Sequence, residues 1–234
     1  MSLTLTNIPR IMRSQGWVNG ARLMETWFSR PPAIAPAYGP PETSIIRIDS
    51  WVLTYPRARQ VYDKIISGRI WENPASQKEI ATMLRRKGLL KASCWAFGGG
   101  TASVELQDPD YINFRVVDQS VVSGLNDLAA ALANFVFRLL VSGTVEEDKG
   151  TYKVRIMEVG IYVRDSYDFN GSQHLGFWND SDNSVSSWNP LSGTAVGNSD
   201  FTAWRTANGR GGDFLVFSDI KKTTLSPPFS FTFQ

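Results

Sequence analysis

Cysteine and histidine are almost absent from this sequence. Its 234 residues contain one of each, Cys94 and His174. A single cysteine excludes an intramolecular disulfide, so a packed core has to hold the fold together. Cys94 stands between Ser93 and Trp95 in an apolar stretch, a setting typical of a buried, unreactive thiol. With a mass of 26.1 kDa and 42% hydrophobic residues, the chain is long enough to bury such a core.

Long apolar runs and a large excess of charge are also missing. No stretch of roughly 18 apolar residues occurs, which excludes a membrane-spanning helix. The formal net charge is only +2, from 24 basic and 22 acidic residues, and this balance argues against nucleic-acid binding through bulk electrostatics. Arg10, Arg13 and Arg22 interrupt the apolar residues near the N-terminus. We therefore expect no secretory signal and synthesis in the cytoplasm.

The first half of the sequence carries most of the helix signals. Helices are expected within 1–30 and over 57–67, 74–87 and 123–132. The second of them ends at Gly68, and the third begins with a capping-box spacing from Ser76 to Glu79. Five prolines between Pro31 and Pro41 predict an extended connector. We accordingly expect an N-terminal segment over 1–60 and one α+β domain over 61–234.

The second half changes to the period of two that is typical of strands. Strands are expected over 44–53, 113–122, 135–145, 152–163, 214–217 and 229–233. A turn at 146–150 predicts that the third and fourth of these pair as an antiparallel hairpin, with Phe135, Phe137 and Leu139 facing the core. The Asn- and Ser-rich stretch 179–199 predicts a long exposed loop. The expected fold class is therefore α+β, with helices in the N-terminal half and a mainly antiparallel sheet in the C-terminal half.

Four polar side chains of three types cluster directly after the expected strand 152–163. Asp165, Tyr167, Asp168 and His174 fall within ten consecutive residues. A histidine beside two carboxylates is a candidate acid, base or metal ligand. The same segment is rich in turn formers, so a purely structural turn is the competing interpretation. Asp213 is a weaker second carboxylate candidate in a turn.

The same four residues resemble the active-site motif of the colicin M family of bacterial toxins. That motif reads Asp-x-Tyr-Asp, five further residues and then His-Arg, and this chain departs from it at Leu175, where the family has arginine. The resemblance covers about 130–220. It implies an open, curved antiparallel sheet with flanking helices. The activity it implies is metal-dependent cleavage of lipid II between its polyprenol and its pyrophosphate.

A longer stretch, about 93–222, resembles an uncharacterised bacterial family found near type VI secretion genes. The shared pieces include Leu125-Asn126-Asp127-Leu128, Leu175-Gly176-Phe177-Trp178 and Arg210-Gly211-Gly212-Asp213-Phe214. This resemblance implies delivery by a secretion machine and a carrier protein as partner. It names no activity.

The resemblance to colicin M implies a role for each motif residue. Asp165 and Asp168 would hold Mg²⁺, Tyr167 would orient a phosphate oxygen, and His174 would act as acid or base. Candidates to replace the missing arginine in binding the substrate are Arg164, Arg205 and Arg210.

Taken together, these observations predict an antibacterial effector that acts on a lipid-linked cell-wall precursor in the periplasm of a target cell. An immunity protein would then be a second partner. The alternatives are a non-enzymatic adaptor of the secretion apparatus with a degenerate site, and an immunity-type binding protein. Trp178, Trp188 and Trp204 indicate either core packing or a lipid or partner surface.

Overall fold

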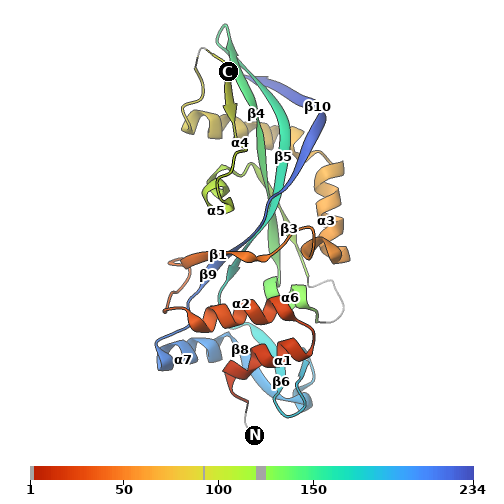
Figure 1. Ribbon diagram of the computed structural model, residues 1–234, viewed down its shortest axis with the longest axis vertical. Coiled ribbons are helices and arrows are strands. Elements are labelled where there is room, and N and C mark those ends of the chain that lie inside the picture. Colours follow the sequence, from red (N-terminus) through yellow and green to blue (C-terminus); the bar gives the residue numbers. More distant parts are fainter. Residues whose placement is uncertain (1–2, 92, 120–124) are drawn as a thin grey trace. The chain divides into compact units, whose positions relative to one another are not determined.

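The computed structural model describes residues 3–91, 93–119 and 125–234. Helices lie mostly in the N-terminal half and strands mostly in the C-terminal half, so the α+β fold class is confirmed (Figure 1). Within the described residues, no helix has the length and apolar character needed to cross a membrane.

The helices of the described chain are mainly short. They are α1 (Ile8–Ser14), α2 (Val18–Ser29), α3 (Pro56–Ser67), α4 (Pro74–Arg86), α5 (Val104–Gln107), α6 (Asp127–Leu132) and α7 (Asn198–Asn208). Single 3₁₀ turns lie at η1 (Leu5–Asn7), η2 (Val52–Thr54), η3 (Ile70–Glu72), η4 (Asp108–Asp110) and η5 (Pro190–Ser192). The expected helices over 57–67 and 74–87 are confirmed as α3 and α4. For 123–132, α6 covers the described part, and residues 123 and 124 lie outside it.

The strands form two sheets. They are β1 (Gly39–Ile46), β2 (Trp95–Phe97), β3 (Asn113–Val117), β4 (Phe135–Asp148), β5 (Thr151–Tyr167), β6 (His174–Asn179), β7 (Ser184–Ser186), β8 (Thr194–Gly197), β9 (Phe214–Ser218) and β10 (Lys221–Phe233). Among the described residues, the larger sheet has the order β1-β9-β5-β4-β2, with β10 paired to β5 and β3 to β4. The smaller sheet has the order β7-β6-β8.

The chain divides into two compact units that interleave along the sequence. Unit 1 contains 1–46, 118–135 and 165–216, and unit 2 contains 47–117, 136–164 and 217–234. Strands β5 and β9 each contribute residues to both units. The boundary expected near residue 60 stays a prediction.

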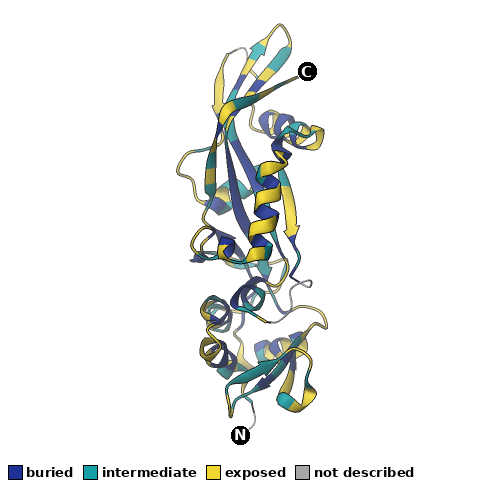
Figure 2. Cartoon of the chain, turned by 90° about the vertical axis from the view of Figure 1, so that its right-hand side faces the viewer, coloured by how far each residue is buried: buried dark blue, intermediate teal, exposed yellow. Residues whose placement is uncertain are grey.

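The β4–β5 hairpin is confirmed as an antiparallel pair. Phe137 lies opposite Val163 and Leu139 opposite Ile161, and all four side chains are buried. Phe135 is buried as well, so the predicted inward face is correct. Burying one such large apolar side chain contributes roughly 1.5–3 kcal/mol, and a slip of one residue in register would expose the whole face. Figure 2 shows this concentration of buried residues along the sheet.

Several expectations about local structure were wrong. The helix expected within 1–30 is confirmed as α2, but the additional helix α1 before it was not expected. The strand expected over 44–53 ends at Ile46, and β1 begins inside the proline segment at Gly39. Proline is tolerated there because β1 is an edge strand of its sheet.

Helix α4 has Asn73 as its N-cap, which accepts a hydrogen bond from the Ser76 amide at 2.7 Å, so the capping box from Ser76 is absent.

The loop expected over 179–199 was also wrong in part, because it contains β7, η5, β8 and the start of α7. The last strand is longer than expected, since β10 begins at Lys221. For the strand expected over 113–122, β3 ends at Val117, and residues 120–122 lie outside the described part.

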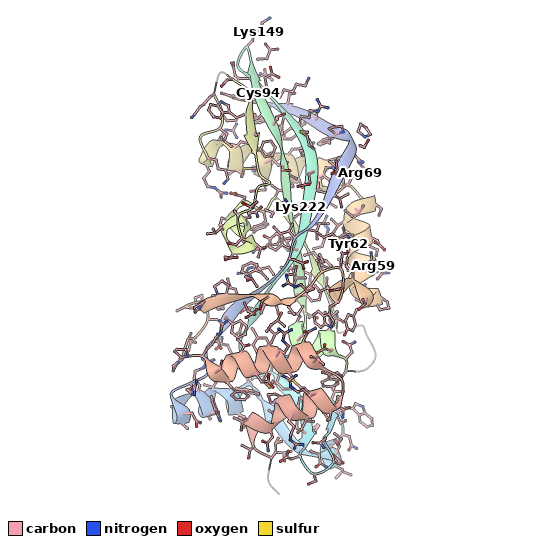
Figure 3. The ribbon with its side chains drawn as sticks, viewed as in Figure 1. Arg59, Tyr62, Arg69, Cys94, Lys149 and Lys222 are labelled. Atoms are coloured by element: carbon pink, nitrogen blue, oxygen red, sulfur yellow. The ribbon has the colours of Figure 1, made fainter. Side chains whose placement is uncertain are left out.

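Cys94 does not have the buried environment that the sequence indicates. Its side chain is exposed, and Ser93, Trp95 and Ala96 beside it are exposed as well. Figure 3 labels Cys94 in the segment that leads into β2. The local apolar sequence was misleading because a short strand of this kind buries only Phe97.

Candidate functional site

A cavity of about 460 Å³ lies within unit 1 and contains the whole predicted motif in its lining. Asp165, Tyr167, Asp168 and His174 all line it. The first two are the last residues of β5, and His174 is the first residue of β6. The end of one strand, the following turn and the start of the next strand therefore place the four side chains around one space.

Tyr167 is the buried member of the group. It is 7% exposed, and its ring stacks on Phe214 with 5.3 Å between ring centroids. Burial, and then the nearby charge of Asp165, raise the pKa of the Tyr167 phenol well above its ordinary value. A tyrosine phenol is already protonated at neutral pH, and the raised pKa extends this to alkaline pH, so Tyr167 is a hydrogen-bond donor in the cavity lining.

Asp168 uses its carboxylate to hold the turn. It accepts hydrogen bonds from the Ser166 hydroxyl, from the Asn170 amide N–H at 3.3 Å and from the Asn170 side-chain amide at 3.1 Å. Ser166 is in turn hydrogen-bonded to the Tyr38 hydroxyl at 2.9 Å. This is the structural role that turn-forming sequences predict, and it coexists with the position of Asp168 in the cavity wall.

His174 is exposed at the start of β6, the central strand of the small sheet. It pairs with Gly197 of β8, and its ring is tilted against Phe177 at 4.7 Å between centroids. The imidazole is thus held by the strand on one side and open to solvent on another. That exposure suits exchange of a proton with water.

A buried ion pair and its hydrogen bonds hold the motif turn in place. Asp213 has no exposed surface and forms an ion pair with Arg205, which is itself 5% exposed. The same carboxylate accepts hydrogen bonds from the Trp27 indole at 2.9 Å and from the Asn170 side chain at 3.3 Å. Arg205 was a candidate for binding the substrate and Asp213 a weaker second carboxylate candidate, whereas the structure buries both side chains next to the turn.

The other two candidate arginines do not line the cavity. Arg164 belongs to unit 2, where its Nε atom lies 3.8 Å from a carboxylate oxygen of Asp108. Arg210 is exposed and donates a hydrogen bond to the carbonyl of Ser29 at 2.7 Å. The structure therefore brings together the four motif residues and leaves the three arginines outside the cavity lining.

The two carboxylates fit a Mg²⁺ site that water and substrate phosphates complete, and they do not fit a site made by protein side chains alone. Among the residues that the structure describes, no group of three or more His, Cys, Asp or Glu side chains could hold a metal ion. Asp165 and Asp168 nevertheless line the same cavity. Mg²⁺ commonly takes only one or two carboxylates and completes its shell with water and substrate phosphates. The donor set fits this arrangement.

An apolar wall of the cavity was missed by the sequence analysis. Its residues come from α1, the start and middle of α2, α6 and β6: Met12, Trp17, Met24, Leu132 and Trp178. Trp17 and Trp178 pack edge to face at 6.4 Å. Trp178 lies close to the motif and was named in the sequence analysis as a core or lipid-surface residue. No local sequence signal identifies the other members, because they lie far from the motif along the chain.

Asp127 joins two of the helices that form the wall. Its carboxylate accepts hydrogen bonds from the backbone N–H groups of Asn19 at 3.2 Å and Gly20 at 2.8 Å, in the first turn of α2. A carboxylate there also interacts favourably with the positive end of the helix dipole. Asn126 caps α6 itself by accepting from the Ala129 amide. The Asn126-Asp127 pair thus fixes α2 and α6 together.

Asn198, the first residue of α7, is a further cavity residue that the sequence did not reveal. Its side-chain amide donates to the carbonyl of Asn170 at 2.5 Å. It is 3% exposed, and its Oδ1 atom has no hydrogen-bond partner among the described residues. An acceptor of this kind beside the cavity is suited to a bound water or to a donor group of a ligand.

Comparison with known proteins identifies a family whose function is unknown. No curated protein matches this chain. No solved structure matches it either. A model of a family of unknown function, DUF6402, matches residues 3–195 and 192–233, and the chain belongs to that family.

Proposed function

We propose that this protein is an antibacterial effector that hydrolyses the bond between polyprenol and pyrophosphate in lipid II. The observation that carries the proposal is the shared cavity of Asp165, Tyr167, Asp168 and His174. Two carboxylates, a phenol and an imidazole in the lining of one cavity are the groups that cleavage beside a pyrophosphate requires. Water would be consumed, and the products would be free polyprenol and the pyrophosphate-linked head group.

Each side chain has a role that its environment supports. Asp165 and Asp168 would hold Mg²⁺, which would supply positive charge for the pyrophosphate. Tyr167 would donate a hydrogen bond to a phosphate oxygen, because a tyrosine phenol keeps its proton at neutral pH. His174 is open to solvent, so it would exchange a proton with the attacking water or the leaving oxygen.

The apolar wall supports a lipid substrate over a water-soluble phosphate ester. Trp17, Met24 and Trp178 give the cavity a non-polar side close to the carboxylates. A polyprenyl chain would gain about 25 cal/mol for each Å² of apolar surface that it buries there. A small hydrophilic diphosphate would gain nothing from that wall.

The proposed site of action is the periplasm of a competing bacterium, reached through a type VI secretion machine and its carrier protein. A cell that makes such an effector would also need an immunity protein. These proposals rest on the resemblance of the longer stretch to a family found near secretion genes.

A non-enzymatic adaptor of the secretion apparatus is the second candidate. Two observations favour it. The carboxylate of Asp168 already has hydrogen-bond partners in its own turn, and Leu175 stands where the colicin M motif has arginine. In that case the motif residues would only stabilise the turn and would have no catalytic role.

Release of polyprenol from purified lipid II in Mg²⁺ tests the first candidate. Asp168→Asn and His174→Gln should each lower the rate by about a hundredfold or more. Asp182→Asn is the matched control, because Asp182 also accepts a backbone N–H two residues ahead, from Ser184 at 3.0 Å, and is outside the cavity lining. Its rate should equal that of the wild type. Absence of polyprenol release by the wild-type protein would favour the adaptor.

A further inference from the structure

The segment between Asp182 and Asp200 combines two features that rarely occur together. It contains no Asp, Glu, Lys, Arg or His over residues 183–199. It also carries the two most exposed large hydrophobic side chains of the described chain, Trp188 at 80% and Leu191 at 93%. An uncharged surface loop that holds a tryptophan and a leucine in water loses the free energy that their burial would provide.

The loop that carries these two side chains has a defined conformation. The Ser186 hydroxyl oxygen accepts hydrogen bonds from the backbone N–H of Trp188 at 3.4 Å and of Asn189 at 3.1 Å. Asn189 caps η5 by accepting from the Leu191 amide at 3.1 Å. The backbone is therefore ordered before anything binds, and contact with a partner needs little further loss of conformational entropy.

This loop also borders the candidate site. Ser187, the residue before Trp188, lines the same cavity as Asp168 and His174. All of these residues belong to unit 1. The exposed tryptophan therefore directly follows a residue of the cavity lining.

We propose that Trp188 and Leu191 form a membrane-docking loop that inserts into the interfacial region of a lipid bilayer. This inference rests on the proposed function, because lipid II is held in a membrane by its polyprenyl tail. Tryptophan favours the boundary between head groups and acyl chains, where its ring is buried and its N–H stays hydrated. No charged group within 183–199 would have to lose its hydration on insertion.

The composition of the loop also decides which membranes it binds. Surface attachment through basic residues requires anionic lipids and weakens as salt screens the charges. The loop contains no basic residue, so its binding depends on apolar contact alone. It should bind neutral phosphatidylcholine vesicles, and binding should not weaken with salt.

Vesicle flotation with the full chain tests this. The vesicles consist of phosphatidylcholine without lipid II, at low salt and at about 1 M salt, where the Debye length is only about 3 Å. The double variant Trp188→Ser with Leu191→Ser should lower the partition coefficient by at least about tenfold. Leu106→Ser is the matched control, since Leu106 is 71% exposed in α5 of unit 2. Its partitioning should equal that of the wild type.

Three results would overturn the proposal: wild-type protein that stays out of the vesicle fraction, a double variant that floats like the wild type, or binding that high salt abolishes. The first would direct attention to a protein partner for the same loop. Cleavage of lipid II dispersed in detergent separates this inference from the proposed enzyme activity. A wild type that floats but cleaves no lipid II would contradict the activity and leave the docking loop supported.

Discussion

The side-chain amide of Asn170 lies 3.3 Å from the carboxylate of Asp213, and this hydrogen bond ties the motif turn to a buried ion pair. The same amide also donates to Asp168 at 3.1 Å. Asn170 therefore connects the buried carboxylate of Asp213 to the carboxylate of Asp168, which lines the cavity. The position of the candidate site depends on groups that never contact a substrate.

Asp213→Ala should be strongly destabilising. It would leave the guanidinium of Arg205 buried without its carboxylate, and removal of one partner of a buried pair costs about 3–5 kcal/mol. Urea unfolding curves measure the change. Asp63→Ala, an exposed substitution on α3, is the control and should shift stability by less than about 0.5 kcal/mol. Similar midpoints for the two variants would show that Arg205 finds another partner.

Asp168 and His174 should differ in their effect on stability. His174 is exposed, so His174→Ala should change the free energy of unfolding by no more than about 0.5 kcal/mol. Asp168→Ala removes hydrogen bonds from Ser166 and Asn170 and should cost about 1–2 kcal/mol. Thermal melts of both variants test the difference. If Asp168→Ala melts at the wild-type temperature, those turn contacts do not contribute to stability.

Glu42 should make folding stability depend on pH in the acidic range. Burial alone would raise the pKa of its carboxyl, but hydrogen bonds from Ser44 and Ile45 and the charge of Arg30 outweigh burial and lower it. A lowered pKa in the folded state stabilises the protein above the ordinary glutamate pKa of about 4.3, and this stabilisation disappears as the pH falls through the folded value.

Glu42→Gln tests this pH dependence, because the variant has no carboxyl to titrate at that position. The difference in melting temperature between wild type and variant should be largest near neutral pH and should shrink as the pH falls below about 4. A difference that is constant over the whole range would mean that shape, and not charge, accounts for the effect.

Cys94 should react rapidly with Ellman's reagent in the native protein. Its side chain is exposed, so one thiol per chain should titrate without denaturant. Cys94→Ser provides the blank. If the thiol reacts only after unfolding, Cys94 is buried in the native protein, as its apolar sequence neighbours indicate.

Toxicity should depend on the compartment in which the protein is made. Exported to the periplasm of a Gram-negative cell by an added signal sequence, the wild type should cause lysis, whereas the same protein without that signal should be tolerated. The reason is that the proposed bond is cleaved on the outer side of the inner membrane. Growth curves of cells expressing wild type or His174→Gln measure the effect. Equal killing from both compartments would indicate a different target.

Local patterns predicted the parts of the fold that local interactions determine. The period of two from Phe135 and the turn before Thr151 were sufficient for the β4–β5 hairpin. Glycine and proline signals were sufficient for α3 and α4. Helix α7 was missed because polar residues obscure its apolar face, although Phe201 and Trp204 have helical spacing.

The candidate site was predictable only where it is contiguous in sequence. Asp165 to His174 are neighbours along the chain, so their meeting needed no tertiary information. The apolar wall needed it, since Trp17 and Leu132 reach the cavity from distant segments. Arg205 shows the opposite error, because composition cannot distinguish an arginine that binds a phosphate from one that neutralises a buried aspartate.

The interleaving of the two units has a consequence for synthesis on the ribosome. Unit 1 needs residues up to 216 and unit 2 needs residues up to 234, so neither can be completed before residue 216 has been synthesised. Helices α1 and α2 emerge early and must wait for α6 and for the end of β5 before their apolar faces are covered. Non-local pairing of this kind slows folding and leaves apolar surface open to aggregation. The nascent chain should therefore depend on chaperones until these later segments have been synthesised.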